Sequence, residues 1–444
     1  MEKEQKHIII KKLLYGVFLG ILLLSTSQFY FSLIEESPLK GDVKEVYAPV
    51  FTSKNWYNGI FQDSINDYLK YNFGFRNSSV RLNNQIAYDL FKEVKANGVV
   101  VGKEEYLYEK NYIKAYLGLD FVGEEEIQDK INKLAYIQKK LSKKGKKLIV
   151  AFAPGKGTFY PEFIPEEYDT VTKRTSNYEV YKRLLGKTEI DVIDFNKWFV
   201  EQKEISDYPL YPKAGIHWSK YGEFLAADSI VRFIEKIRGN EMSHLVLDSV
   251  ITKEKNEKTD YDIGNGMNLM FRTPTFSMGY PKYHIEPSTS SKGSKTLFVS
   301  DSFFWGMFNS GFSKKLFGGG KFWYYAKSIY PDSFKKPTLV SKKNIIQRME
   351  AHDNVIILCT DANLYKFAFK FIDKAYSAYK SGIKSEPKAE ESYKERLRRG
   401  FRNIRETPHW LEKVKKQAIE KGISLEQCIE DNAKYIIWQE DQKK

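Results

Sequence analysis

The stretch Thr296-Leu297-Phe298-Val299-Ser300-Asp301-Ser302-Phe303-Phe304-Trp305-Gly306 decides the fold that we expect for this chain. Five β-prone residues lead into a small polar turn and then a helix-compatible segment, which predicts a strand, a bend and a helix. Such a bend exposes the hydroxyl of Ser302 at the carboxyl end of the strand and directs the following backbone N–H groups at the atom that it attacks. Serine is a weak nucleophile without a base. The best candidate base is His217, in the upstream stretch Gly215–Gly222.

Short apolar segments alternate with amphipathic helices through the middle of the chain. We expect strands at 147–153, 191–194, 296–300, 322–325 and 355–359, and helices at 124–143, 177–185, 218–237 and 344–350. This alternation predicts an α/β fold, a parallel sheet with helices on both faces. Sites in such sheets collect at the carboxyl ends of the strands, where Pro154, Ser302 and Asp361 fall.

The same pattern predicts how the chain is divided. We expect a cytoplasmic N-terminus at 1–12, a transmembrane signal anchor at 13–31, a juxtamembrane linker and helical lead-in at 36–100, the α/β domain at 101–380, a linker at 381–402 and a C-terminal helical tail at 403–444. Within the domain, 239–292 lacks the alternation, and we expect an irregular excursion beside the site. The C-terminal helices are expected to be accessory.

The segment Leu13–Phe31 carries no charge and is long enough to span a bilayer as a helix. Lysines precede it and Glu35 and Glu36 follow it, which favours a single span with the N-terminus inside and the rest of the chain outside. A cleaved signal peptide is the alternative. The apolar run is long for a signal peptide and no small-x-small cleavage site follows it cleanly, so an uncleaved anchor is favoured.

Composition limits the partners. The formal net charge is +14 and 42% of the residues are hydrophobic, which indicates a folded, basic chain. A basic surface suits anionic lipid or polysaccharide, although lysine richness also fits a merely solvated surface. No zinc-finger, RRM or helix-turn-helix signature is present, so we expect no nucleic-acid partner. Cys359 and Cys428 cannot form a disulfide framework, and no His/Cys cluster has zinc-ligand spacing. We therefore expect no metal and no cofactor.

The order of motifs resembles a known family. A His-Trp motif comes first, then an excursion, then a strand ending in Asp301-Ser302-Phe303. The supporting motifs are Phe73-Gly74-Phe75-Arg76, the turn from Gly102-Lys103 to Leu107-Tyr108, Pro154-Gly155-Lys156 with Tyr160-Pro161, Tyr261-Asp262-Ile263-Gly264, and Asn268-Leu269. This order, over about 45–380, is similar to the DHHW and alginate O-acetyltransferase (AlgX/AlgJ)-like group of SGNH hydrolase-like proteins. That group resembles circularly permuted SGNH hydrolases, with the histidine motif ahead of the serine motif.

The resemblance implies roles for individual residues. Ser302 would be the nucleophile, with its own backbone N–H as one oxyanion donor, and His217 would be the general base. Possible supporting residues are Asp301, which caps the helix or holds the turn, Trp218 of the His-Trp motif, and Lys156, a charged candidate just past a strand end. A second oxyanion donor is sought near Tyr324 or Tyr325, or at Asn363; for the tyrosines, sheet packing is the competing interpretation.

One departure from the family pattern concerns the acid. The family motif is Asp-x-His-Trp, and its aspartate orients the histidine, but this chain has Gly215 at that position. Three interpretations stay open. The site works as a Ser–His dyad, or another acid such as Asp207 approaches from a different direction, or the site is inactive and retained for binding. Loss of a triad acid can cost about four orders of magnitude in rate.

The resemblance implies a bacterial enzyme anchored in the cytoplasmic (inner) membrane, with its catalytic domain in the periplasm or outside the cell. It would be an O-acetyltransferase of exopolysaccharide biosynthesis, taking acetyl groups from a partner membrane-bound O-acyltransferase and passing them through Ser302 to a polysaccharide acceptor. Two alternatives remain. One is a carbohydrate esterase that uses the same Ser–His site, and the other is a non-catalytic polysaccharide-binding or assembly protein.

Overall fold

The computed structural model describes residues 2–41, 44, 46–288, 294–340, 344–381, 393–421 and 423–442. Contacts divide the chain into two units, which we describe separately. Unit one comprises Met1–Ala96, Asn265–Arg272 and Leu397–Ile436. Unit two comprises Asn97–Gly264, Thr273–Arg396 and Ile437–Lys444.

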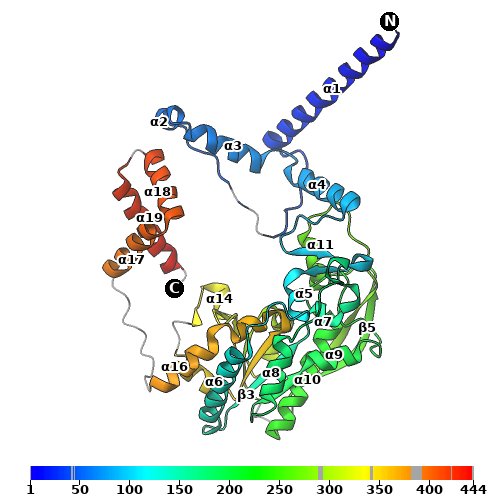
Figure 1. Cartoon of the computed structure of the whole chain (residues 1–444), viewed down its shortest axis with the longest axis vertical. Coiled ribbons are helices and arrows are strands. Elements are labelled where there is room, and N and C mark those ends of the chain that lie inside the picture. Colours follow the sequence, from blue (N-terminus) through cyan, green and yellow to red (C-terminus); the bar gives the residue numbers. More distant parts are fainter. Residues whose placement is uncertain are drawn as a thin grey trace. The chain divides into compact units, whose positions relative to one another are not determined.

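A six-stranded sheet with the order β4-β3-β10-β7-β8-β9 forms the centre of unit two (Figure 1). Its strands are β3 (Lys147–Ala153), β4 (Asp191–Asp194), β7 (Thr296–Ser300), β8 (Phe322–Tyr324), β9 (Ser328–Tyr330) and β10 (Asn354–Thr360). Every neighbouring pair is parallel except β8 and β9. The predicted parallel sheet is therefore confirmed, with one correction: β9 adds an antiparallel strand at the edge.

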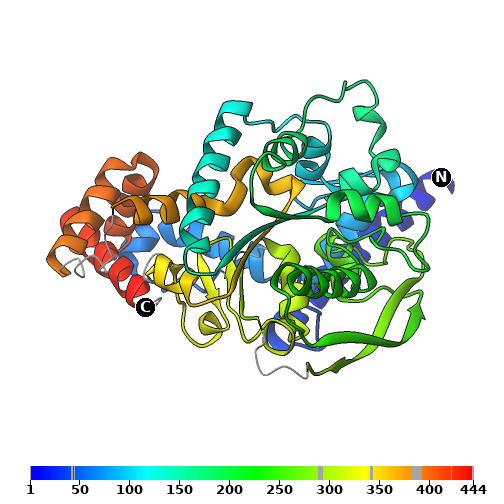
Figure 2. The same ribbon diagram turned by 90° about the horizontal axis from the view of Figure 1, so that it is seen from below.

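Helices cover both faces of this sheet, as the sequence predicted (Figure 2). One face packs on α6 (Glu124–Ser142), α8 (Asn177–Leu185), α15 (Ile345–Glu350) and α16 (Phe371–Ser381). The other face carries α9 (Phe195–Gln202) and α10 (Lys220–Arg238). Because both faces are covered, β3, β7 and β10 are buried almost throughout, which is why they read as apolar runs.

Shorter elements complete unit two. The strands β1 (Val99–Val101) and β2 (Leu107–Glu109) form a small antiparallel pair. The short helical segments are η1 (Lys103–Glu105), α5 (Lys110–Tyr116), α7 (Lys156–Phe159), η2 (Pro161–Phe163), η3 (Glu166–Tyr168), η4 (Lys258–Tyr261), α11 (Asp262–Gly266), η5 (Ser302–Phe304), α12 (Trp305–Asn309), α13 (Phe312–Lys315), α14 (Asp332–Lys335) and η7 (Asp361–Lys370).

The stretch 239–292 is not wholly irregular, which corrects the sequence-based expectation. It contains β5 (His244–Lys253) and β6 (Met278–Glu286), which pair antiparallel with a register shift between Leu247 and Ser249. We call this pair, together with residues 254–264 that follow β5, the β5–β6 arm. Most of its residues are exposed or half-buried, so the strands lack the clear apolar alternation by which half-buried strands are recognised.

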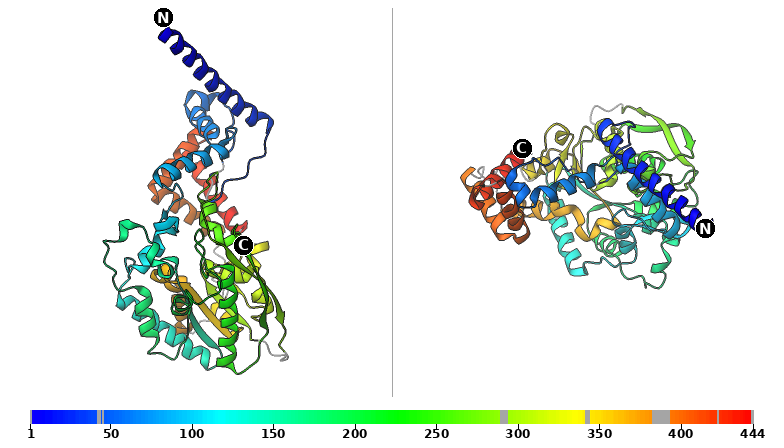
Figure 3. Two further views of the ribbon diagram at one scale, coloured as in Figure 1. Left: turned by 90° about the vertical axis from the view of Figure 1, so that its right-hand side faces the viewer. Right: turned by 90° about the horizontal axis from the view of Figure 1, so that it is seen from above.

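Unit one is helical. Its N-terminal helix α1 (Glu2–Phe31) is a single straight helix in Figure 3, and its segment Gln5–Phe31 is long and apolar enough to cross a membrane, with a mean hydropathy of 2.1. Signal sequences share these properties. The helices α2 (Ser53–Tyr57), α3 (Ile60–Asn72) and α4 (Arg76–Phe91) follow.

Three helices end the chain: α17 (Tyr393–Glu406), α18 (Pro408–Lys421) and α19 (Leu425–Gln442). They share a small core that includes Ile404, Val414 and Ile429. The three helices overlap the helical tail that was predicted at 403–444. The linker expected at 381–402 is helical from Tyr393, and residues 382–392 lie outside the described residues.

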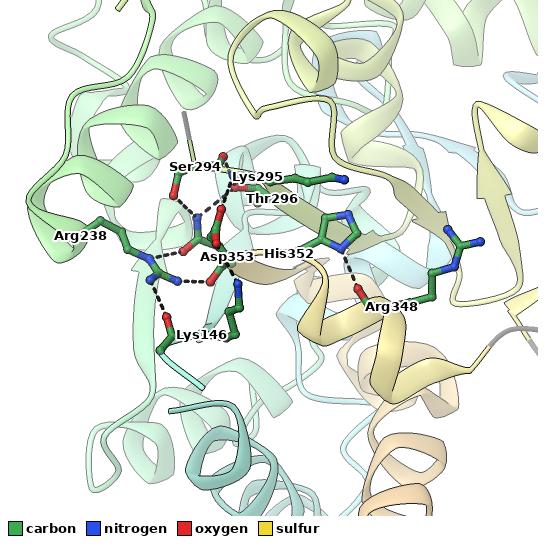
Figure 4. A network of polar contacts seen from close by, with 10 residues as sticks. Lys146, Arg238, Ser294, Lys295, Thr296, Arg348, His352 and Asp353 are labelled. Carbon is green, nitrogen blue, oxygen red and sulfur yellow. Dashed lines mark hydrogen bonds and ion pairs between the residues drawn. The ribbon is translucent and has the colours of Figure 1, made fainter. Parts of the chain in front are cut away.

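A polar cluster fixes the amino ends of the central strands, at the edge opposite Ser302 (Figure 4). Arg238, the last residue of α10, donates to the backbone oxygen of Asp353 and to Asn354 Oδ1 (2.8 Å). The Asp353 carboxylate accepts from Lys146 Nζ (3.0 Å) and from the backbone N–H of Lys295 (2.9 Å). These bonds join the residues that precede β3, β7 and β10, so they hold the three strands in register.

We predict that Asp353→Asn destabilises the protein and reduces its sensitivity to acid. Burial alone would raise the pKa of Asp353, but the hydrogen bonds from Lys146 and Lys295 lower it. A lowered pKa stabilises the fold above the ordinary aspartate pKa of about 4, and this contribution is lost as the pH falls through the folded value. Because the side chain is partly exposed, we expect a loss of about 1 kcal/mol at neutral pH.

Thermal unfolding of the full chain in detergent, followed by circular dichroism from neutral to acid pH, measures this effect. The control is Asp373→Asn, which removes an ion pair with Lys133 on the surface of α16. Equal stability of wild type and Asp353→Asn at neutral pH would contradict the role of the cluster.

Candidate active site

The bend after β7 is held by a buried carboxylate. Asp301 Oδ1 accepts from the backbone N–H of Phe303 (3.1 Å), which caps η5. Asp301 Oδ2 accepts from the N–H and hydroxyl of Thr360 (2.9 and 3.0 Å) and from Asn363 Nδ2 (2.9 Å), at the end of β10. Asp301 therefore both caps the helical turn and ties it to the neighbouring strand, with Ser302 at the resulting bend.

The histidine segment and the serine segment meet. His217 Nε2 lies 2.9 Å from Ser302 Oγ, although the two residues are 85 positions apart. The buried ring of Trp218 packs edge-on against Phe303, with ring centroids 5.3 Å apart, and Phe303 also contacts the His217 ring at 5.0 Å. Hence the residues that follow the histidine and the serine pack on each other and keep the two side chains together.

A carboxylate from the β5–β6 arm completes the arrangement. Asp262 Oδ2 lies 2.6 Å from His217 Nδ1, and Asp262 Oδ1 accepts from the backbone N–H groups of Ile216 (2.9 Å) and Ile263 (2.8 Å). These bonds fix the rotation of the carboxylate, which in turn orients the imidazole. Asp262, His217 and Ser302 thus form one continuous chain of hydrogen bonds.

Gly215 is explained by the path of the segment that carries Asp262. A Cβ atom at position 215 would lie 2.3 Å from the backbone oxygen of Thr259 and 2.7 Å from Pro212 Cγ. The N–H of Gly264 also donates to the oxygen of Ala214 (3.0 Å), so the two segments run in contact. The position at which the family pattern has its acid is therefore filled by the backbone of a second segment, and that segment brings an acid of its own.

Lys156 does not face a substrate, which corrects the sequence-based interpretation of a charged site residue. Its side chain is fully buried, and its Nζ donates to the backbone oxygens of Lys213 (2.6 Å) and Gly215 (2.9 Å). Burial lowers its pKa well below the ordinary lysine value. Lys156 is accordingly a positioning residue that holds the loop leading to His217.

The structure does not support Asp207 as the acid or Asn363 as an oxyanion donor. Asp207 is exposed, and Asp262 occupies the place beside His217 that Asp207 was expected to fill. The Asn363 amide is directed at Asp301 and at the hydroxyl of Thr360 (3.2 Å), so its hydrogens already have acceptors.

The two tyrosines lie at the same carboxyl edge of the sheet. Tyr324 packs on Trp305 at 5.3 Å, which agrees with the competing interpretation of sheet packing. The N–H of Tyr325 donates to the oxygen of Ser300 (2.8 Å), the residue that ends β7. Burial, followed by the charge of Asp301, raises the pKa of Tyr325, so its phenol stays protonated and able to donate.

The electrostatics of the site centre on His217. Burial alone would lower its pKa, but the hydrogen bond and charge of Asp262 raise it above the ordinary value of 6.5. Glu109, at the end of β2, is a second carboxylate that interacts electrostatically with His217. Burial and the charge of Asp262 raise the pKa of Glu109, while His217 lowers it. Burial also raises the pKa of Asp260, two positions before Asp262, to about 7.

Asp262 and Glu109 were not predicted from the sequence as residues of the site. The signal for Asp262 was the motif Tyr261-Asp262-Ile263-Gly264, which was noted as part of the resemblance without a role for its acid. No motif pointed to Glu109, which is near His217 only through the fold. Within the described part of the chain, no group of three or more His, Cys, Asp or Glu side chains is arranged to hold a metal ion.

The segment that carries Asp262, His217 and Ser302 matches a known family. Residues 99–302, which include His217, Asp262 and Ser302, match the family model of the SGNH hydrolase-like domain of the acetyltransferase AlgX. We call this segment the AlgX-type domain, after the family model that it matches. The predicted SGNH-like fold is thereby confirmed. A search of curated proteins found no match.

Three solved structures are similar to part of this chain. The O-acetyltransferase domain of Pseudomonas putida AlgJ has 14% identity and a TM-score of 0.42 and covers 63% of this chain and 99% of its own. Pseudomonas aeruginosa AlgX has 16% identity and a TM-score of 0.38, covering 62% of this chain and 67% of its own. Bacillus cereus PatB1 has 14% identity and a TM-score of 0.35, covering 56% and 93%.

We predict that Gly215→Ala destabilises the protein by about 1–3 kcal/mol, the usual cost of overpacking. The added methyl group meets the backbone of Thr259, which cannot move without displacing Asp262. Urea unfolding of the full chain in detergent measures the loss. Gly186→Ala is the matched control, because its methyl group would make only ordinary contacts, the nearest at 3.4 Å. Equal stability of the two variants would show that the Asp262 segment does not depend on a glycine at 215.

Proposed function

We propose that this chain is a membrane-anchored, extracytoplasmic O-acetyltransferase that modifies a polysaccharide through an acyl-enzyme on Ser302. The observation that carries the proposal is the chain of hydrogen bonds from Asp262 through His217 to Ser302. All three residues lie in the segment that matches the acetyltransferase AlgX. Acyl transfer is the chemistry that a serine, a histidine and an acid in this order perform on many unrelated folds.

The first half-reaction forms the acyl-enzyme. Ser302 Oγ attacks the carbonyl carbon of the acetyl donor while its proton moves to His217 Nε2. The negative charge of Asp262 stabilises the imidazolium and keeps its Nε2 directed at the serine. When the tetrahedral intermediate collapses, the bond to the leaving group breaks and His217 returns the proton to that group.

The second half-reaction transfers the acetyl group. A sugar hydroxyl gives its proton to His217 Nε2 and attacks the acetyl-serine ester, and Ser302 Oγ regains the proton as the new ester leaves. The backbone N–H of Ser302 is the proposed first oxyanion donor. The Tyr325 phenol, on the turn beside the end of β7, is the proposed second donor.

The proposal includes a membrane anchor. The segment Gln5–Phe31 is long and apolar enough to cross a membrane, and its most apolar part is not buried inside the protein, which supports a membrane-spanning helix. The lysines before Leu13 and the acidic residues after Phe31 favour an N-in, C-out orientation, with the AlgX-type domain in the periplasm or outside the cell. A membrane-bound O-acyltransferase is the proposed source of acetyl groups, because the active serine would lie on the side of the membrane away from cytoplasmic acyl donors.

The two alternative functions are a carbohydrate esterase and a non-catalytic binding protein. A carbohydrate esterase would use the same three residues with water as the acceptor, and release of acetate without a sugar would reveal it. A non-catalytic binding protein was suggested by Gly215 alone. That reason is weakened because Asp262 fills the place beside His217 that position 215 leaves empty.

We predict that the full chain in detergent becomes acetylated on Ser302 when it is incubated with p-nitrophenyl acetate. Peptide mass spectrometry locates the label, and p-nitrophenol release gives its rate. Ser302→Ala should abolish the label, and His217→Ala and Asp262→Ala should slow it by up to about 10⁴-fold because the serine then lacks an oriented base.

A second His–Asp pair in the chain provides the control. His284 Nδ1 lies 2.7 Å from Asp248 on the exposed surface of the β5–β6 arm, without the serine. His284→Ala and Asp248→Ala should leave the label unchanged. A folded chain with no label on Ser302, or a label that does not need His217, would reject the acyl-enzyme.

We predict a pH profile for the labelling rate that depends on Asp262. Acylation needs neutral His217, so the rate should rise with pH through a pKa above 6.5. In Asp262→Asn the remaining effect of burial lowers the pKa, so the rise should move to lower pH while the plateau falls. Asp248→Asn should behave like wild type. An unchanged midpoint in Asp262→Asn would show that Asp262 does not control the protonation of His217.

A further inference from the structure

A pocket of about 240 Å³ lies between the start of α10, the β5–β6 arm and the segment after α12. Its polar lining comes from Lys220 and Glu223 of α10, from Lys253, Glu257 and Lys282 of the arm, and from Ser310. Its aromatic lining comes from Phe224, Tyr280, Tyr283 and Phe312. None of the acyl-transfer steps described above uses these residues.

The pocket is built from the segments that carry the active site. Lys220 follows His217 by three positions at the start of α10. Glu223 packs directly on Gly306, four positions after Ser302, because a Cβ atom on Gly306 would meet its carboxylate. Tyr280 lies beside Asp260, whose charge raises the pKa of the tyrosine after the larger effect of burial. Each of the three residues of the hydrogen-bonded chain thus has a near neighbour that lines or contacts the pocket.

The lining has the chemistry of a sugar site. Tyr283 lies between Phe224 and Phe312, with ring centroids 5.6 Å from each, and so offers a rigid aromatic surface to the apolar face of a sugar ring. Polar groups stand beside it: Ser310 Oγ donates to Glu223 Oε1 at 3.1 Å. Small-molecule sites combine such an aromatic wall with a few placed polar groups.

The charges of the pocket favour an uncharged ring. The chain as a whole carries a net charge of +14, but two of the three lysines that line the pocket are paired with carboxylates. The third, Lys282, is exposed to solvent, which screens its charge. Lys220 pairs with Glu223 at 2.8 Å, and Lys253 pairs with Glu257 at 2.6 Å. A uronic acid would bring a further anion beside Glu223 and Glu257, whereas the hydroxyl and amide groups of a neutral sugar can hydrogen-bond to both members of each pair.

We propose that this pocket binds an uncharged sugar residue of the acceptor glycan and so presents a neighbouring hydroxyl to the acetylated Ser302. The part of this proposal that concerns acetyl transfer rests on the proposed function. Sugar binding is inferred from the pocket lining alone, so sugar binding and acylation of Ser302 can be tested separately.

The binding experiment uses the full chain carrying Ser302→Ala in detergent, titrated by calorimetry with cellotetraose, chitotetraose and tetragalacturonate. We expect at least one of the two neutral tetrasaccharides to bind more tightly than tetragalacturonate. Tyr283→Ala should weaken that binding about tenfold, because the aromatic wall is lost, and Tyr283→Phe should keep most of it. Tyr136→Ala, a half-buried tyrosine on α6, is the matched control and should bind like the parent.

The outcomes separate the two proposals. If neither neutral sugar binds, or if Tyr283→Ala does not weaken the binding, the proposal that this pocket binds a sugar is rejected. Tighter, Tyr283-dependent binding of tetragalacturonate overturns the preference for an uncharged ring. Tyr283-dependent binding of a neutral sugar by a chain whose Ser302 never acquires a label keeps the pocket and rejects the transferase.

Discussion

The contact between Asp262 and His217 is the constraint on which the candidate site depends. A histidine buried beside a serine needs its second ring nitrogen occupied, because otherwise its tautomer and its rotation are not fixed. Asp262 provides this contact from a different segment than the family pattern would, and its other oxygen is held by two backbone N–H groups. This arrangement restricts position 215 to glycine, because the backbone of Thr259 lies too close for a Cβ atom there.

The position of the serine depends equally on the sheet. Asp301 joins the end of β7 to the end of β10, while the cluster around Arg238 and Asp353 joins their beginnings. Two parallel strands fixed at both ends form a rigid support. The position of the bend at Ser302 is therefore set by the backbone register of these strands and not by contacts with a substrate. Lys156 extends the same support to the histidine loop by holding the oxygens of residues 213 and 215.

The elements that are buried on both faces could be predicted from the sequence, because apolar runs such as 147–153 and 355–359 leave few alternatives to a covered strand. The meeting of His217 and Ser302 was also expected, from the order of the motifs. The strands β5 and β6 were missed because their side chains are largely exposed, which weakens the alternation. The contact of Asp262 with His217 joins residues 45 positions apart, and no local pattern encodes it. Lys156 was misjudged for the same reason: its place after a strand suggested the site, but its burial and its partners are properties of the fold.

The β5–β6 arm supplies two things at once. Asp262, which sets the basicity of His217, lies between its strands, and Tyr283 and Glu257, which line the pocket, belong to the same insertion. Any exchange or remodelling of this insertion during evolution would therefore alter proton transfer and ligand recognition together. A descendant that acquired a new glycan by replacing the arm would also have to recover an acid for its histidine, so changes of specificity are expected to proceed by point substitutions on the arm rather than by its replacement.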